Sequence, residues 1–342
     1  MISKMLFRFT LIKLLLILLL GGLAIHAPAQ LIRGTVIDSQ TDGVVSFASV
    51  YFSGTTVGTV AGENGEFELD ISRHHTLPLT VSAVGYSSVT LAEFSTDESL
   101  KISLMPLVYD IDAVNISGRS LKRERLANLR VFRNQFLGRT SYARRCEILN
   151  EEDITFNYGS DTVTLKAIAF KPLQVQNKAL GYIITFHLES FEYWRETGNA
   201  LYTGKFIFTD DNSGIFRNIK EARRKNAYLG SAMHFFRSLW DNDLSSQGFR
   251  VRDQQGNNLS YEDVVVIEEG QKYLEHSGDL FINYSANPGS EYFIRTISPV
   301  RLLKGRVFFD ENGYFDPVAI MLTGEMGKHR VGDMLPLGFV PR

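Results

Sequence analysis

The sequence predicts a mainly β protein in which a small N-terminal β-sandwich precedes an α+β domain with a mostly antiparallel sheet and two main helices. Between residues 31 and 104, β-branched or alternating runs recur about every ten residues without helical periodicity. After residue 118, alternating segments are mixed with two stretches of apolar residues at helical spacing. A chain of 342 residues, 44% of them hydrophobic, is long enough for two domains with separate cores.

The first 29 residues have the three zones of a secretory signal peptide. Lys4, Arg8 and Lys13 form the basic zone, residues 14–20 the apolar zone, and Ala27-Pro28-Ala29 the cleavage zone. We expect cleavage after Ala29 and an exported, periplasmic or outer-membrane-associated protein. The apolar run is too short to cross about 30 Å of hydrocarbon, so we expect no membrane-spanning segment in the mature chain. An uncleaved signal anchor is the alternative.

Cysteine usage and charge limit the remaining possibilities. Cys146 is the only cysteine, so the chain cannot form an internal disulfide, and we expect this residue to be a small buried hydrophobe. Removing the leader takes away three basic residues and leaves a net charge of about −5. This balance argues against nucleic acid as a partner.

The first domain, residues 30–118, is predicted to be the sandwich. Its strands are expected at 31–37, 47–52, 66–71, 79–84, 88–91 and 100–104, with a closing strand at 113–116. Tight turns are expected at 42–43, 53–54 and 63–65, where Asp, Asn or Gly tolerates a positive φ. Phe67, Leu69, Val84 and Tyr86 are predicted to face the core.

This part of the sequence resembles the carboxypeptidase regulatory-like domain, a transthyretin-like β-sandwich. The matching stretches are Gly34-Thr35-Val36-Ile37-Asp38, Ala48-Ser49-Val50, Gly54-Thr55-Thr56-Val57-Gly58-Thr59, Asn64-Gly65-Glu66-Phe67 and Val84-Gly85-Tyr86. The resemblance implies an accessory module without catalytic residues, of the kind found on secreted peptidases and outer-membrane receptors. Ala61-Gly62 replace the usual Thr-Asp, so no ion or hydrogen-bond role is carried over to them.

The second domain, residues 119–342, is predicted to begin with a helix. Ser120 is a suitable N-cap, and Gly138 follows the last apolar position. Between them, apolar residues recur at three- and four-residue steps, namely Leu126, Leu129, Phe132 and Phe136.

The other face of this helix is strongly basic, and we single it out as a candidate partner-binding surface. It consists of Lys122, Arg123, Arg125, Arg130 and Arg133. An acidic partner, such as lipid A phosphates or an anionic protein patch, would suit it. The alternative is a solvated helix facing Glu151, Glu152 and Asp153.

Alternating segments predict one sheet at the centre of the second domain. They lie at 162–170, 182–188, 204–208, 264–267, 280–284, 306–309 and 318–322. Residues 310–313 are predicted to form the hairpin turn between the last two.

A second helix is expected within residues 219–244, with an apolar stripe of Leu229, Met233, Phe236 and Trp240. We predict Ser231 as its N-cap, with 223–225 in the preceding loop because cations are unfavourable at a helix N-terminus.

This region resembles the uncharacterised C-terminal half of bacterial envelope proteins that carry the same sandwich. The matching stretches are Phe136-Leu137-Gly138, Cys146, Ile148-Leu149-Asn150, Asn177-Lys178-Ala179-Leu180-Gly181-Tyr182, Gly230-Ser231, His234-Phe235 and Leu335-Pro336. We take Arg223, Arg224, Ser231 and His234 as a candidate motif of this domain. The resemblance implies no activity.

The chain lacks the common catalytic signatures. None of the seven histidines forms a pair four residues apart, and no nucleophile elbow, phosphate loop, dinucleotide fingerprint or Cys-x-x-Cys is present. Residues 210–214 superficially resemble a calcium loop but are predicted to be a plain turn. We therefore predict no cofactor and no metal.

Two functions remain. The first is a non-enzymatic envelope protein that binds an envelope protein or anionic surface through a sheet edge or the helix at 120–137. The alternative is a hydrolase whose site is assembled from distant residues, for example His187 or His234 with Asp or Glu partners.

Overall fold

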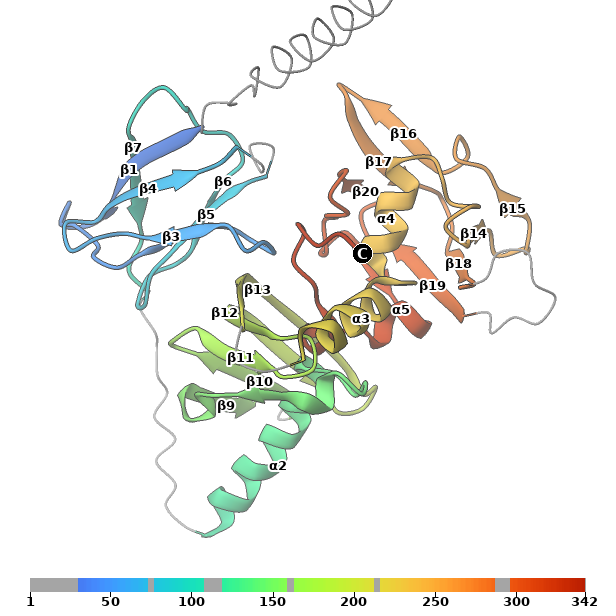
Figure 1. Ribbon diagram of the computed structural model, residues 1–342. Coiled ribbons are helices and arrows are strands. Elements are labelled where there is room, and N and C mark those ends of the chain that lie inside the picture. Colours follow the sequence, from blue (N-terminus) through green and yellow to red (C-terminus); the bar gives the residue numbers. More distant parts are fainter. Residues whose placement is uncertain are drawn as a thin grey trace, which may run out of the picture.

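The computed structural model describes residues 30–72, 77–107, 119–158, 163–211, 216–286 and 296–341, with the backbone alone at 119–121. The predicted leader, the predicted closing strand at 113–116 and most of the predicted turn at 210–214 lie outside these ranges. The described chain is mainly β and forms three units: an N-terminal sandwich, a middle unit and a third unit (Figure 1). The predicted fold class is confirmed.

The sandwich is built from two small sheets. One has the order β4-β1-β7, with β1 and β7 parallel, and the other has the antiparallel order β3-β2-β5-β6. The strands are β1 (Leu31–Asp38), β2 (Ser49–Phe52), β3 (Gly58–Val60), β4 (Glu66–Asp70), β5 (Leu79–Ser82), β6 (Val89–Leu91) and β7 (Leu100–Leu104). Buried Val36, Val50, Phe52 and Leu79 fill the space between the two sheets.

Most sandwich elements lie where the sequence places them, with three differences. The strand β3 was not predicted, and β2 begins two residues later than expected, at Ser49. Phe67 and Leu69 are buried and Tyr86 is half-buried, but the prediction for Val84 is wrong because this side chain is 60% exposed. Strand β5 already ends at Ser82, so strand alternation no longer determines where the side chain of Val84 points.

The middle unit is a six-stranded antiparallel sheet with helix α2 (Arg119–Phe136) packed on one face (Figure 1). Its strands are β8 (Cys146–Ile148), β9 (Ile154–Tyr158), β10 (Thr164–Ala169), β11 (Leu173–Asn177), β12 (Tyr182–Trp194) and β13 (Asn199–Asp210). On one side β12 pairs with β11 and β10, and on the other side it pairs with β13 along its whole length. Phe132 and Phe136 of α2 pack on Phe186 and Phe191 of β12.

Two predictions about α2 are wrong. The helix already includes Arg119, so Ser120 lies inside it and is not the N-cap. Leu126 is 59% exposed, whereas Leu129, Phe132 and Phe136 are buried. Each three-residue step turns the helix by about 300°, so two such steps place Leu126 about 120° around the axis from Phe132.

The third unit contains two further sheets and three helices. The five-stranded sheet has the order β15-β14-β18-β19-β21, and the three-stranded sheet has the order β16-β17-β20. The strands are β14 (Phe249–Arg252), β15 (Asn258–Leu259), β16 (Val265–Glu268), β17 (Gln271–Glu275), β18 (Leu280–Tyr284), β19 (Thr296–Leu302), β20 (Arg306–Phe309) and β21 (Ile320–Leu322). The helices are α3 (Arg217–Tyr228), α4 (Ala232–Trp240) and α5 (Gly324–Lys328).

The expectation of one central sheet in the second domain is therefore wrong, since the middle and third units have separate cores. The predicted turn at 310–313 is present, with an antiparallel bridge between Phe309 and Phe315 across it, but it does not pair the two predicted strands. Strand β20 pairs with β17 and β21 pairs with β19, so the two strands belong to different sheets. The chain does turn there, because the Asp310 carboxylate accepts hydrogen bonds from the amides of Asn312 and Tyr314, both at 2.9 Å.

The stretch at 219–244 forms two helices, α3 and α4, instead of one. Ser231 is the N-cap of α4, as predicted, and its hydroxyl accepts a hydrogen bond from the His234 amide at 3.2 Å. The placement of residues 223–225 in a loop is wrong, because they lie in the C-terminal half of α3. The helix dipole favours cations near a helix C-terminus, so these basic residues are favourably placed in α3 instead of being unfavourable at the N-terminus of α4.

The sandwich is attached to the free edge of β13 by the turn between β2 and β3. The amide of Gly54 donates to the Phe206 carbonyl at 2.8 Å, and the amide of Phe208 donates to the Thr55 carbonyl at 2.9 Å. The amide of Leu337, in the C-terminal segment that runs between the three units (Figure 1), donates to the Gly54 carbonyl at 2.7 Å. Arg237 of α4 holds this segment through the carbonyls of Leu337 and Phe339.

Gly204 in β13 provides a test of the middle unit. A Cβ atom at this position would overlap the His187 carbonyl oxygen and the Phe186 ring. We expect Gly204→Ala to lower the free energy of unfolding by about 2–3 kcal/mol, measured by urea denaturation. Gly338→Ala is the control, since a Cβ atom there meets nothing within 4 Å. Equal stability of the two variants would contradict this packing.

Candidate functional site

The structure divides the predicted basic face of α2 into two groups. Arg125 turns toward the sheet and donates to the carbonyls of Glu151 and Ile154 at 2.9 and 2.8 Å. Arg133 forms an ion pair with Glu151. For these two residues the alternative prediction, a helix facing the acidic turn at 151–153, describes the contacts.

Lys122, Arg123 and Arg130 remain exposed. Arg123 and Arg130 lie about 100–120° around the helix axis from buried Leu129, whereas Lys122 lies on the same helical face as Leu129, about two turns before it. Within the described ranges, no ion pair or hydrogen bond joins their side chains to other residues. Arg123, exposed Leu126 and Arg130 follow one another at steps of three and four residues, so they form a continuous surface. We call Lys122, Arg123, Leu126 and Arg130 the outer face of α2.

The opposite side of α2 holds this surface in place. The rings of Phe132 and Phe136 are fully buried and stack with centroids 4.9 Å apart. Phe136 also meets Phe186 of β12 edge to face at 4.9 Å. Because this buried side is packed to aromatic van der Waals contact, the outer face of α2 is presented on a rigid support.

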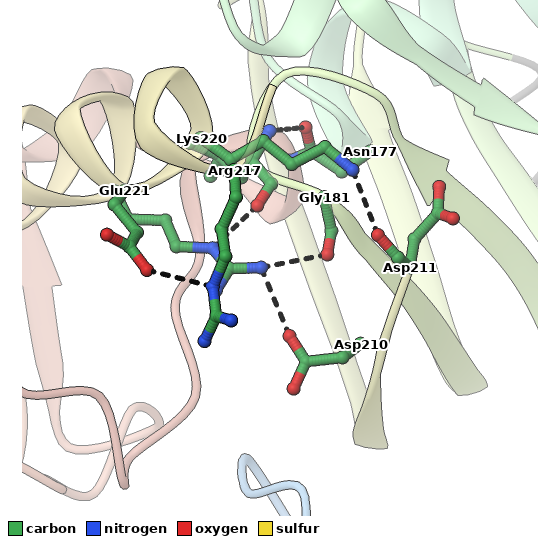
Figure 2. A network of polar contacts seen from close by, with 9 residues as sticks. Asn177, Gly181, Asp210, Asp211, Arg217, Lys220 and Glu221 are labelled. Atoms are coloured by element: carbon green, nitrogen blue, oxygen red, sulfur yellow. Dashed lines mark hydrogen bonds and ion pairs between the residues drawn. The ribbon is translucent and has the colours of Figure 1, made fainter. Parts of the chain in front are cut away.

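Arg223 and Arg224 of the candidate motif join α3 to the turn between β11 and β12. Figure 2 shows the polar contacts between α3, this turn and the end of β13. The Arg224 guanidinium donates to the carbonyls of Leu180 at 2.7 Å and Gly181 at 2.9 Å, and to the Asp210 carboxylate at 3.1 Å. It also lies 3.8 Å from the ring centroid of Tyr182. Arg223 makes a longer contact of 3.4 Å with the Ala179 carbonyl.

Asn177 fixes the conformation of the turn that Arg224 holds. Its side-chain oxygen accepts hydrogen bonds from the amides of Ala179 and Leu180 at 3.1 and 2.9 Å. Its side-chain nitrogen donates to the Gly332 carbonyl at 2.9 Å. The stretch 177–182, which carries part of the resemblance, therefore joins distant segments of the chain.

His234 is a structural histidine. It is 2% exposed; its Nδ1 accepts a hydrogen bond from the Gly230 amide at 3.1 Å, so its Nε2 is the donor to Gln247 Oε1 at 3.2 Å. Burial lowers the pKa of the ring, which keeps it neutral. Since both nitrogens are occupied, the arrangement leaves no lone pair for a substrate or a metal.

His187 lies in a cleft of about 330 Å³ between the sandwich and the middle unit. The cleft is lined by residues 82–88, 107, 168–172 and 187–189. Ser82 Oγ and His187 Nε2 are 3.1 Å apart across it, and Ser88 Oγ donates to Glu189 at 2.9 Å.

Ser82 and His187 are the residue types of a nucleophile and its general base, but the hydroxyl is not accessible and the imidazole is not basic enough. Ser82 is only 2% exposed, so a substrate carbonyl cannot approach its hydroxyl. Burial lowers the pKa of His187 to about 4, which makes the imidazole a weak base at neutral pH. The pair therefore joins the sandwich to the sheet, and the hydrolase alternative gains no support from it.

Cys146 is partly buried, and its pKa is raised to about 12, mainly by burial and also by the negative charge of Asp333. The side chain stays a thiol at neutral pH and is not a reactive nucleophile. Across the ranges that the structure covers, no group of three or more His, Cys, Asp and Glu residues is arranged to hold a metal ion. In those ranges no helix is both long and apolar enough to span a membrane.

Comparison with known proteins supports part of the resemblance. Residues 32–116 match the family model of the CarboxypepD_reg-like domain. No curated protein matches the chain. One solved structure, of a proposed membrane-associated protein of unknown function from Bacteroides fragilis NCTC 9343, aligns over 86% of this chain and 94% of its own. It shares 11% identity at a TM-score of 0.17, a likeness too low to support any argument.

The Arg224 contacts provide a second test. Arg224→Lys keeps the charge but loses the planar group that reaches two carbonyls and a carboxylate at once. We expect the free energy of unfolding to fall by about 2 kcal/mol in urea denaturation. Arg217→Lys is the matched control, since Arg217 is 85% exposed and, among the described residues, its side chain pairs only with Glu221 one turn away. A loss of equal size in the two variants would contradict the role given to Arg224.

The buried His187 predicts a dependence of stability on acid. Its pKa is about 4 when folded and 6.5 in the reference state, so the unfolded chain binds the proton more readily. The contribution of neutral His187 to the free energy of unfolding is fully present above about pH 6.5. It falls by about 3 kcal/mol as the pH approaches 4. His187→Gln should remove most of this loss in urea denaturation at several pH values, while His234 continues to contribute with the same sign. An unchanged pH slope in the variant would count against this environment for His187.

Proposed function

We propose that this chain is an exported, non-enzymatic protein of the cell envelope, periplasmic or outer-membrane-associated, which acts by binding. Its contact surface is the outer face of α2, and its partner carries negative charge. One observation carries the proposal: Lys122, Arg123 and Arg130 surround the exposed Leu126 on a helix whose other side is firmly packed.

Two further features support this function. The N-terminal residues have the zones of a secretory leader, and the match of residues 32–116 to the CarboxypepD_reg-like domain suits an accessory module. The polar contacts of Arg223, Arg224, Ser231 and His234 are made within the chain, and they support a structural role for this motif.

The chemistry of the outer face of α2 favours an anionic surface. A basic residue near such a surface contributes about 1 kcal/mol, and this contribution falls off within a Debye length of about 10 Å at moderate salt. Leu126 adds apolar area at the centre of the charged group. Binding should therefore be sensitive to salt and should depend on the arginines.

Vesicles of phosphatidylglycerol and phosphatidylcholine test this function as a model anionic surface. We expect the protein to cosediment with them and not with pure phosphatidylcholine vesicles. Arg123→Gln with Arg130→Gln should weaken binding about 30-fold, because two contributions of about 1 kcal/mol are lost.

Arg250→Gln with Lys304→Gln is the matched control, since it removes two exposed positive charges from the third unit. It should bind as the unchanged protein does. Equal binding by the α2 variant and the unchanged protein would refute the proposed surface.

A further inference from the structure

The sandwich exposes an aromatic ring on a strained backbone. Phe47 has φ +59°, in the left-handed region that a bulky residue seldom adopts, and its side chain is 64% exposed. A residue held in this conformation loses stability and gains no burial in return. The combination therefore calls for a role outside the core of the sandwich.

Two exposed valines lie on the segments that flank the Phe47 backbone. The Phe47 amide donates to the Gly62 carbonyl, and Val60 of β3 pairs with Ser49, two residues after Phe47. Val44 lies beside Gly65, which is in the same β3–β4 connection as Gly62. Val44 and Val60 are 56% and 59% exposed. We call Val44, Phe47 and Val60 the Phe47 patch.

The rim of the Phe47 patch is acidic. Glu63 and Glu66 are exposed beside it, and within the described residues no side-chain hydrogen bond or ion pair engages their carboxylates. In the part of the chain that the structure describes, the Asp42 carboxylate has one ion pair, a long 3.9 Å contact with Lys101. A partner of this patch must therefore offer apolar area surrounded by positive charge.

The outer face of α2 has this composition: Leu126 is exposed between Lys122, Arg123 and Arg130. Within one molecule the two surfaces belong to different units, since the Phe47 patch lies beside β3 of the sandwich and α2 lies on the sheet of the middle unit (Figure 1). We propose that the Phe47 patch of one molecule binds the outer face of α2 of a second copy. This inference rests on the proposed function and names the anionic partner of α2.

The contact joins two different surfaces, so it is heterologous and leads to rings or open chains of molecules instead of a closed two-fold dimer. Binding of the Phe47 patch to itself is unfavourable, because Glu63 and Glu66 would face their own copies. Self-association should therefore rise with protein concentration and weaken with salt.

Sedimentation velocity over a concentration series of the purified protein tests the proposal by charge reversal. Arg123→Glu with Arg130→Glu, and separately Glu63→Arg with Glu66→Arg, should each abolish self-association. An equimolar mixture of the two variants should restore it, because each reversed surface then finds a complementary one. Arg250→Glu with Lys304→Glu is the control and should associate as the unchanged protein does.

Phe47→Gly separates binding from folding. Glycine adopts the positive φ freely, so the melting temperature should not fall, whereas loss of the ring should weaken self-association about tenfold or more. A lowered melting temperature would assign Phe47 to the fold and refute its role in association.

The proposal is overturned if the unchanged protein stays monomeric at every concentration, or if reversal of Glu63 and Glu66 leaves self-association intact. The vesicle assay distinguishes this failure from failure of the proposed function. Glu63→Arg with Glu66→Arg should bind anionic vesicles at least as well as the unchanged protein, whereas reversal at Arg123 and Arg130 should not. Anionic binding without self-association would assign α2 to another anionic surface and would refute the second copy as its partner.

Discussion

Backbone hydrogen bonding at the free edge of β13 is the constraint on which the arrangement of the units depends. An edge strand presents unpaired amides and carbonyls that invite uncontrolled pairing. Here the turn around Gly54 occupies part of this edge through Phe206 and Phe208, and the C-terminal segment adds Leu337 to the same glycine. Gly54 has a positive φ, which glycine adopts freely, and its amide and carbonyl bond to two different segments of the chain. This junction sets the orientation of the sandwich relative to α2, and hence of the two surfaces to which we assign binding.

The elements that local patterns could predict are those that alternate or repeat within a few residues. Strands such as β18 and β20 lie where the alternation places them, and Ser231 caps a helix as its chemistry predicts. Pairing between strands distant in the chain has no comparable local pattern in the sequence, so it could not be predicted. The turn at 310–313 suggested a hairpin, but β20 and β21 belong to different sheets because β17 and β19 compete successfully for their edges.

Charge in the sequence identified the helix that carries the candidate surface, but it did not show which of its basic residues stay exposed. The density of arginines in α2 identified the helix, whereas the contacts of Arg125 and Arg133 with Glu151 join segments 18 to 26 residues apart, which no local pattern reveals. Phe47 is the opposite case, in which a residue expected in a strand is exposed. Its neighbours suggest a buried strand residue, and a left-handed phenylalanine has no signature in the sequence. Polar residues that suggested chemistry instead have structural contacts: Arg224 joins α3 to the middle unit, and His234 bonds to Gly230 and Gln247 within the third unit.

The three units thus carry a basic surface on α2 and an acidic, apolar surface on the sandwich. The sandwich is fixed to β13 and does not move independently. Amide hydrogen exchange at Gly54, Phe208 and Leu337 measures this most directly, because these three amides make the connecting bonds. We expect protection comparable to that of core amides in β12. Exchange at the rate of open loops would show that the sandwich moves independently of β13 and would contradict this coupling.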